Sequence, residues 1–363
     1  MDLQNLGWND FFQTQYQECE NEEFVPARVI AQHKGKYQVY TSDGERTAQL
    51  AGSFSYHNTL QKQYPAVGDW VLIRFVENFE GVIIQDVLDR QNYFSRKLPI
   101  SGGRKLKNGV IDGGLTEEQV IAANIDTVFI IIGLDDDFNI RRIERYLTLV
   151  YNSGTTPVII LNKIDICSNT ADSVRQVEEI AFGISVYAIS ATEEKGLEVF
   201  NQYLDVGKTV AFIGSSGVGK STLSNYFLGK DRQKIKTVSE STGKGRHTTS
   251  HRELLFIPSG GMIIDTPGMR EIQLWGGREE VKQNFRDIVK IARRCKFNDC
   301  HHDTEPGCAI KQALKNGTLN KERYDSYLKQ MAEIKRLEEK KKLYDDSLSG
   351  KERLRLKMKY GRF

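Results

Sequence analysis

A chain of 363 residues is long enough for two or three domains, and 39% hydrophobic with 27% charged residues is a globular composition. No apolar run is long enough to cross a membrane, and the first residues lack the basic-then-apolar order of a signal peptide, so we expect a soluble cytoplasmic protein with no membrane partner. The formal net charge of +3 is too small to indicate a nucleic-acid partner by itself.

Residues 1–90 are predicted to form a helical arm and a small β-barrel. Aromatic residues from Trp8 to Tyr16 are spaced as one apolar face of a short helix. From Phe24 the pattern changes to short alternating segments, separated by hairpin signals at residues 34–36 and 42–44. The number and length of these segments fit an oligonucleotide-binding (OB) barrel. The expected strands are Ala27–Ala31, Tyr37–Thr41, Thr47–Leu50, Asp69–Phe75 and Gly81–Val87.

The barrel pattern leaves two functions open. Exposed basic side chains could bind RNA, and the candidates are Arg28, Lys34, Lys36 and Arg46. The barrel could equally be a protein-docking module, because a fold does not determine a function. Residues 91–124 are less regular and are predicted to be a connector. Their segment 101–109 is rich in glycine and basic residues, and an exposed plain linker is favoured there over a contact with nucleic acid.

Residues 125–275 have the pattern of an α/β domain. Near-continuous apolar strands alternate with helical segments, which predicts a parallel sheet covered on both faces. The loops at the carboxyl ends of these strands should form the site. The expected strands are Thr127–Ile132, Pro157–Leu161, Ser185–Ile189, Thr209–Ile213, Leu254–Ile257 and Met262–Ile264. The expected helices are Ile140–Tyr151, Ala171–Ile180, Gly196–Tyr203 and Lys220–Phe227.

Two loops in the first half of this domain predict a guanine site. Asn162-Lys163-Ile164-Asp165 follows an expected strand, and N-K-x-D is the guanine-specifying sequence of GTPases. The Asp165 carboxylate can accept hydrogen bonds from the guanine N1–H and N2–H₂ groups, whereas adenine has no matching pair of donors. We expect Lys163 to lie along the base plane and Asn162 to tie this loop to the phosphate loop. Ser190-Ala191-Thr192 resembles the S-A-x motif, whose backbone N–H meets guanine O6.

The next loop predicts a polyphosphate site. After the strand at Thr209–Ile213 the chain matches G-x-x-x-x-G-K-S, the phosphate-binding loop. Its glycines allow successive N–H groups to turn inward, and the helix from Lys220 points its positive end at the same anion. Lys220 should contact the β- and γ-phosphates, and Ser221 should bind Mg²⁺. The candidate phosphate-binding residues are Gly214, Ser215, Ser216, Gly217, Val218, Gly219, Lys220, Ser221 and Thr222.

Two further segments are predicted to be the switch regions. Asp265-Thr266-Pro267-Gly268 matches D-x-x-G, in which Asp265 would hold Mg²⁺ through water and the Gly268 N–H would sense the γ-phosphate. The polar loop 239–250 is expected to be a flexible switch. Within it Thr249, or failing it Thr248, is the candidate for completing the Mg²⁺ coordination. The three candidate magnesium ligands are thus Ser221, Thr249 and Asp265.

Intrinsic hydrolysis is expected to be slow. Met269 stands where small GTPases carry a water-orienting glutamine. His247 could orient or deprotonate the attacking water, because an imidazole titrates near neutral pH. The alternative is that His247 contacts a phosphate or an RNA partner. The candidate catalytic residues are therefore His247, Thr249 and Lys220.

The order of the motifs is unusual. A standard GTPase chain meets the phosphate loop first and N-K-x-D and S-A-x last, whereas here the last two come first. The domain is therefore predicted to be circularly permuted, and the same sheet can still form because neighbouring strands, not chain ends, define it. D-x-x-G then ends the domain, so nucleotide state could be transmitted to the C-terminal part as a movement.

Residues 276–363 are predicted to form an α-helical zinc-binding domain. Cys295, Cys300, His302 and Cys308 place four soft or borderline ligands close together, which suits one structural, tetrahedral Zn²⁺. His301 is a competing fourth ligand, and chance clustering or a redox centre are the alternatives. The expected helices are Arg278–Phe285, Ile310–Lys315 and Lys321–Lys342, the last with an apolar stripe of Tyr324, Tyr327, Leu328, Met331 and Leu337. The basic tail 351–363 fits a solvated terminus as well as a phosphate-backbone contact.

With these motifs in place, nearly the whole chain resembles the circularly permuted, ribosome small-subunit-dependent GTPase A family of bacteria. The resemblance rests on the permuted motif order, on the switch sequence Gly245-Arg246-His247-Thr248-Thr249 and on the C-x4-C-x-H-x5-C zinc pattern. It implies an OB-type barrel, a permuted GTPase domain and a helical zinc domain. Met269 agrees with the family, whose members have no glutamine there.

The resemblance also implies GTP hydrolysis stimulated by the small ribosomal subunit, and a role in late maturation of that subunit. The expected partners are GTP or GDP, the small subunit with its rRNA, and other assembly factors, with the chain itself a monomer. Carried over by motif, Asn162, Lys163 and Asp165 bind guanine, residues 214–222 bind phosphates, and the three cysteines with His302 bind zinc. The competing hypothesis is a GTP-gated RNA- or protein-binding module in which hydrolysis is incidental.

Overall fold

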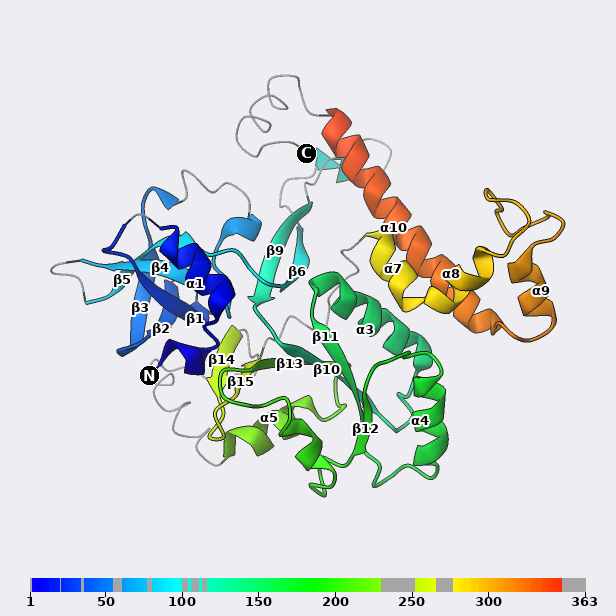
Figure 1. Ribbon diagram of the computed structural model, residues 1–363, viewed down its shortest axis with the longest axis horizontal. Coiled ribbons are helices and arrows are strands. Elements are labelled where there is room, and N and C mark those ends of the chain that lie inside the picture. Colours follow the sequence, from blue (N-terminus) through cyan, green and yellow to red (C-terminus); the bar gives the residue numbers. More distant parts are fainter. Residues whose placement is uncertain are drawn as a thin grey trace. The chain divides into compact units, whose positions relative to one another are not determined.

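The computed structural model describes residues 2–19, 21–33, 36–54, 61–76, 80–99, 104–105, 111–112, 116–229, 252–265 and 277–347 (Figure 1). These belong to two compact units, of which one comprises Met1–Arg96 with Glu118–Gln273 and the other Lys97–Glu117 with Leu274–Phe363. The predicted domain boundaries at residues 90, 124 and 275 stay a prediction. The expected switch loop 239–250, most of segment 101–109 and the basic tail lie outside the described residues.

The N-terminal arm consists of a 3-10 helix, η1 (Leu3–Leu6), and helix α1 (Asp10–Gln17). Asn9 caps α1, because its side-chain oxygen accepts the Phe11 N–H at 3.1 Å. Phe12 is buried, and the Trp8 ring meets the Trp70 ring edge-on at 4.7 Å between centroids. The arm therefore packs on the barrel, as its aromatic spacing predicted.

Five strands close into a barrel: β1 (Val25–His33), β2 (Lys36–Thr41), β3 (Gly44–Leu50), β4 (Trp70–Phe75) and β5 (Val82–Val87). They pair in the order β1-β2-β3-β5-β4, and β4 pairs back with β1. Alternate residues of β2, Tyr37 and Val39, point into the barrel core because successive side chains of a strand face opposite ways. The predicted OB-type barrel is confirmed, including the turn at residues 42–44.

The connector contains strands that the sequence did not predict. β6 (Tyr93–Pro99) pairs with β9 (Thr116–Ala123), and β7 (Arg104–Lys105) pairs with β8 (Ile111–Asp112). The expected plain linker at 101–109 thus has at least two residues, Arg104 and Lys105, in a strand pair.

The α/β sheet has the order β12-β11-β10-β13-β15-β14. Its strands are β10 (Thr127–Gly133), β11 (Thr156–Asn162), β12 (Val186–Ile189), β13 (Thr209–Ile213), β14 (Arg252–Phe256) and β15 (Met262–Asp265). The first four and β15 are parallel, but β14 runs antiparallel to β15, so the expectation of an all-parallel sheet was wrong for that strand. A short chain reversal through Pro258–Gly261 joins β14 to β15, and such a connection only allows antiparallel pairing.

Both faces of this sheet are covered, as predicted. On one face Phe129 and Phe212 pack with Phe200 and Leu223, which come from the 3-10 helix η3 (Leu197–Phe200) and helix α5 (Lys220–Leu228). On the other face Ile130 is buried as well, and helix α3 (Ile140–Ser153) packs on β10 and β11. Helix α4 (Thr170–Glu178) follows β11. The helix expected at Gly196–Tyr203 is only a 3-10 turn.

The barrel and the α/β sheet share backbone hydrogen bonding. β14 pairs antiparallel with β1 at Ala31–Glu253 and Gln32–Arg252, so that one sheet runs through both parts. The Tyr40 and Phe256 rings lie 5.1 Å apart at this junction. β14, which follows the expected switch loop in the chain, is therefore also the strand that pairs with the barrel.

Arg28 was one of the candidates for an exposed RNA contact, and its assignment as exposed was wrong. The residue is 1% exposed, and its guanidinium donates to the carbonyls of Leu6, Gly68 at 3.3 Å and Asn124 at 3.0 Å. Burial lowers the pKa of Arg28 to about 10. Arg28 thus joins the arm, the barrel and the start of the α/β part, which no local pattern around residue 28 indicates.

The C-terminal segment of the second unit is helical over residues 277–347, with α7 (Arg278–Asn284), α8 (Arg286–Ala292), α9 (Ala309–Lys315) and α10 (Lys321–Ser347). Arg323 on α10 pairs with Asp287 at 2.8 Å and its guanidinium lies 4.8 Å from the Phe285 ring, between α7 and α8. The three predicted helices are present. The predicted apolar stripe of the last helix is only partly right. Leu328, which it includes, is 45% exposed, whereas Ile334, which it omits, is fully buried.

None of the helices in the described part of the chain has the length and apolar character needed to span a bilayer.

Candidate functional site

The loop 214–219 joins β13 to α5 with a backbone that requires glycine. Gly214 has φ +147°, and a Cβ there would lie 2.2 Å from the Ile131 carbonyl oxygen. Gly219 has φ +102°, and a Cβ there would lie 2.2 Å from the Asn162 side-chain nitrogen. These positions are restricted both by backbone conformation and by space, which explains two of the motif's glycines.

Lys220 lies across this loop. Its ammonium donates to the Gly214 carbonyl at 2.7 Å and to the Ser215 carbonyl. Ser221 and Thr222 follow in the exposed first turn of α5. The amide groups of that turn have no side-chain cap at Gly219, so the positive end of the helix dipole faces the loop. The arrangement suits a polyphosphate anion.

Asn162 connects the guanine-motif loop to two other loops. Its side-chain nitrogen donates to the Val218 carbonyl at 2.8 Å, which is the tie to the phosphate loop that the sequence predicted. Its side-chain oxygen accepts the Ala191 N–H at 2.9 Å. The Ala191 N–H is therefore engaged within the protein, and the expected contact of an S-A-x backbone N–H with guanine O6 stays a prediction.

The other guanine-motif residues are also held in place. The Asp165 carboxylate accepts the Ser190 hydroxyl at 2.5 Å, and the same hydroxyl accepts the Glu193 N–H at 3.1 Å. Lys163 has φ +74°, an uncommon conformation for a non-glycine residue, and its ammonium lies 2.5 Å from an Asp135 carboxylate oxygen. N-K-x-D and S-A-x thus form one connected edge beside the phosphate loop.

All of these loops follow the carboxyl ends of neighbouring strands. β11 ends at Asn162, β12 at Ile189, β13 at Ile213 and β15 at Asp265, and their parallel pairing brings these ends to one edge of the sheet. The backbone of Asp265 is placed there, next to β13. Gly268, Met269 and the switch residues His247, Thr248 and Thr249 lie outside the described residues.

Two carboxylates at this edge were missed from the sequence. Asp135 and Asp137 follow β10, and the Lys163 ammonium and the Arg142 guanidinium, respectively, hold the pKa of each carboxyl below its usual range. Asp137 also accepts the Ser215 hydroxyl at 2.7 Å. A signal was present in the sequence, because both aspartates follow an apolar strand just as the recognised motifs do, but residues 135–137 belong to none of the GTPase motifs used above.

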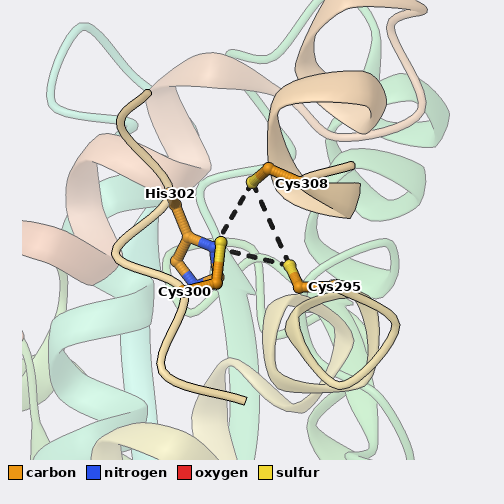
Figure 2. Close-up of side chains that lie close together, drawn as sticks. All are labelled: Cys295, Cys300, His302 and Cys308. Carbon is orange, nitrogen blue, oxygen red and sulfur yellow. Dashed lines mark hydrogen bonds between the residues drawn. The ribbon is translucent and has the colours of Figure 1, made fainter. Parts of the chain in front are cut away.

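A second site, in the helical part of the second unit, consists of Cys295, Cys300, His302 and Cys308 (Figure 2). Their ligand atoms all lie within 4.8 Å of one another, and the His302 Nδ1 is 3.6 Å from Cys295 Sγ and 3.5 Å from Cys308 Sγ. Tetrahedral Zn²⁺ with ~2.3 Å bonds to sulfur places its ligands ~3.8 Å apart, so the donor set and spacing fit zinc. His301 is not part of the cluster.

The local backbone brings these ligands together. Cys295 follows the end of α8, and Cys308 is the N-cap of α9, where its sulfur accepts the Lys311 N–H at 3.5 Å. Between them the Glu305 carboxylate accepts the N–H groups of His301 at 2.8 Å and Asp303 at 3.0 Å, which folds the loop that carries His302. The end of α8, the start of α9 and the folded loop between them thus bring the four side chains together.

Comparison with known proteins identifies the family. The chain is 45% identical over 337 residues to the small ribosomal subunit biogenesis GTPase RsgA of Syntrophotalea carbinolica, which covers 92% of this chain and 90% of that protein. The chain belongs to the RsgA family. The RsgA protein of Opitutus terrae is 42% identical over 91% of this chain and 89% of its own length. A family model described as RsgA GTPase matches residues 104–275.

Solved structures agree with the RsgA fold and its permutation. The crystal structure of YjeQ from Thermotoga maritima has a TM-score of 0.61 at 26% identity, over 86% of this chain and 98% of that one. YloQ, described as a circularly permuted GTPase, has a TM-score of 0.58 at 26% identity, over 87% and 96%. The predicted fold class is confirmed, and RsgA-family membership makes the chain a GTP hydrolase.

A second family model, described as 50S ribosome-binding GTPase, matches residues 209–342. This match starts at Thr209, the first residue of β13 and of the segment that carries the phosphate loop. In a GTPase of standard order the phosphate loop comes first, so a match that omits β10, β11 and β12 is what a permuted chain predicts.

Proposed function

We propose that this chain hydrolyses GTP on the small ribosomal subunit during late maturation of that subunit, and that hydrolysis releases the chain from it. The observation that carries the proposal is the Asn162 side chain, which joins the guanine and phosphate loops in a chain 45% identical to a small-subunit biogenesis GTPase. Such a joined site suits a guanine nucleotide with a polyphosphate tail. The site of action is the cytoplasm, and the chain acts there as a monomer.

Each motif has a proposed task toward the nucleotide. Asp165 accepts hydrogen bonds from the guanine edge, and Lys163 covers the base. The N–H groups of residues 214–222 surround the phosphates, and Lys220 neutralises charge on the β- and γ-phosphates. Gly268 senses the γ-phosphate. His247 orients the attacking water, because Met269 has no group that can do so.

Two metals are proposed, with different roles. Ser221, Thr249 and Asp265 would hold Mg²⁺, which would supply positive charge to offset the negative charge that develops on the phosphates. Cys295, Cys300, His302 and Cys308 would hold one Zn²⁺. All four zinc ligands come from the protein, so the zinc site is closed and its role is structural.

The small subunit is the proposed activator. Without a glutamine after D-x-x-G, the chain lacks the residue that orients water in small GTPases, so an external element would supply the missing contribution to catalysis. Ribosomal RNA is a suitable element because its phosphates present a highly charged surface to the basic residues of segment 101–109 and of the tail 351–363.

Single-turnover GTP hydrolysis with and without purified small subunits tests the proposal. We expect at least a tenfold faster rate with small subunits, and no stimulation by large subunits. The matched control is Lys220→Ala, which should bind no fluorescent GDP and hydrolyse no GTP, because the main phosphate cation is lost. Equal rates with and without small subunits would contradict the proposal.

A further inference from the structure

One loop touches both halves of the nucleotide site. Residues 134–139 join β10 to α3, and the Leu134 N–H donates to the Asn162 carbonyl at 2.8 Å, which anchors the loop beside N-K-x-D. Asn139 caps α3 at the other end, with its side-chain oxygen accepting the Arg142 N–H at 3.1 Å. The loop is thus fixed at both ends, and it carries three consecutive aspartates, residues 135–137.

The first aspartate holds the base-binding lysine. Asp135 Oδ2 lies 2.5 Å from Lys163 Nζ, and each side chain is 27% exposed. Asp135 Oδ1 accepts the Asp137 N–H at 3.2 Å, so the carboxylate is itself oriented by the loop. The Asp135 carboxylate lies close to the end of β10, since a Cβ built on Gly133 would be only 2.8 Å from Oδ1. An oriented carboxylate restricts the ammonium at the end of a flexible stem.

The third aspartate holds the phosphate loop. Asp137 Oδ2 accepts the Ser215 hydroxyl at 2.7 Å and pairs with the Arg142 guanidinium. Arg142 Nη1 also lies 3.0 Å from Ser215 Oγ, so the hydroxyl contacts both members of an ion pair. Ser215 is the second residue of the phosphate loop, and its carbonyl accepts Lys220. The position of Lys220 therefore depends on where Ser215 is held.

We propose that Asp135 and Asp137 are positioning residues of the nucleotide site, Asp135 acting through Lys163 and Asp137 acting through Ser215. One loop then sets the base-binding and phosphate-binding loops relative to each other before nucleotide arrives, which lowers the cost of ordering them on binding. This inference rests on the proposed function of the site.

The charges of the loop are consistent with this role. A carboxylate next to a polyphosphate repels it unless a cation neutralises the carboxylate. Asp135 and Asp137 are each neutralised by a partner, Lys163 and Arg142. Asp136, between them, is exposed, and within the described part of the chain it has no ion pair. Asp136→Asn therefore removes the same charge from the same loop without removing a contact, which makes it the matched control.

Release of fluorescent GDP, followed by stopped flow, tests the proposal in two double-mutant cycles on the full chain. Asp135→Asn is expected to speed release about fivefold in the wild-type background and to have no effect in a Lys163→Met background. Asp137→Asn is expected to speed release about fivefold in the wild-type background and to have no effect in a Ser215→Ala background. Asp136→Asn should leave the release rate within about twofold of wild type.

A merely structural role predicts a different pattern. If an aspartate is merely structural, its substitution changes the GDP release rate by the same factor in both backgrounds of its cycle, and that outcome overturns the proposal. An effect of Asp136→Asn equal to those of Asp135→Asn and Asp137→Asn overturns it as well. Thermal unfolding midpoints check that the variants fold. Should Asp137→Asn unfold, Asp137→Ser in the same cycle replaces it. Wild-type chain that binds no GDP overturns the proposed function as well, whereas slow wild-type release with unaffected variants overturns this inference alone.

Discussion

The Asn162 side chain holds three loops of the nucleotide site together. It donates to the Val218 carbonyl, accepts the Ala191 N–H, and is only 2% exposed, so water does not compete for either bond. An amide supplies a donor and an acceptor in one side chain, whereas a carboxylate supplies acceptors only. This is a physical reason for asparagine, and not aspartate, at the first position of N-K-x-D.

Asp165→Asn should weaken the preference for guanine. The amide keeps an acceptor for the Ser190 hydroxyl, so the loop keeps its shape, but it presents a donor where the carboxylate presented a second acceptor. Loss of a bidentate base contact costs about 1–3 kcal/mol, or roughly fivefold to 150-fold in the GTP-over-ATP preference. Competition of GTP and ATP against fluorescent GDP measures it. An unchanged preference would remove Asp165 from the guanine site.

Arg28→Met should destabilise the first unit by about 3 kcal/mol, because three backbone carbonyls lose a buried donor while the side-chain volume is nearly kept. Urea unfolding followed by tryptophan fluorescence measures it. Arg74→Met on β4 is the control, since Arg74 is exposed and its replacement should change stability by less than about 0.5 kcal/mol. Equal effects of the two changes would mean that the Arg28 contacts contribute nothing.

The core of the barrel contains a phenol whose ionisation should affect stability, that of Tyr37 on β2. Tyr37 is buried, and burial raises the pKa of its phenol to about 12 from an ordinary value of 10. The neutral form is thus favoured in the folded barrel. The resulting stabilisation is complete below pH 10 and is lost as pH rises through 12, by about 3 kcal/mol in all, of which about 2 kcal/mol is lost by pH 12.

The free energy of unfolding, measured in urea at pH 9 and pH 12, tests this expectation against a Tyr37→Phe variant. Phenylalanine has no proton to lose, so its decline between the two pH values should be smaller by about 2 kcal/mol. If both proteins lose the same stability, Tyr37 does not titrate in the unfolding window.

The four residues of the proposed zinc site lie between the end of α8 and the start of α9. Cys300→Ser should abolish zinc binding, because a neutral hydroxyl replaces a thiolate in a four-ligand set. We expect zinc content below a tenth of an ion per chain and rapid proteolysis within residues 293–308. GDP binding should be retained, because the nucleotide loops belong to the other unit. Full zinc content in the variant would exclude Cys300 as a ligand.

At the scale of the whole molecule, the position of β13 explains how a permuted chain makes a GTPase site. β13 lies between β10 and β15, so among the α/β strands those that precede the phosphate loop, β10 to β12, lie on one side and those that follow it, β14 and β15, lie on the other. The ends of β11, β12, β13 and β15 meet at one edge whichever strand comes first along the chain. Motif order is therefore free to change while the site is kept.

The shared sheet predicts that the barrel and the α/β part unfold together. β1 pairs with both β2 and β14, so separating the two parts exposes unpaired strand edges. Hydrogen exchange at rising urea should show residues 25–33 and 252–256 losing protection in the same transition. Exchange of 252–256 at far lower urea, with 25–33 still protected, would show that the β1–β14 pairing is not cooperative.

Much of the fold and site followed from local pattern. Strand alternation placed Tyr37–Thr41 within one residue of β2, and glycine spacing located the loop at 214–219. The errors have physical causes. Arg28 was predicted to be exposed because polar and apolar residues alternate around it, yet its guanidinium is buried where it donates to three carbonyls from distant parts of the chain. β14 was predicted to be one more parallel strand because an apolar run does not encode the direction of its strand.

The sequence by itself determined the three kinds of domain, the motifs, their permuted order and the grouping of three cysteines with His302, since turn chemistry, side-chain periodicity and ligand spacing all act between near neighbours. Only the tertiary structure decided that Arg28 is buried, that β14 joins the barrel to the GTPase sheet, and that Asp135 and Asp137 reach Lys163 and Ser215. Those contacts depend on which remote segments the packed core brings together, and no local pattern specifies that.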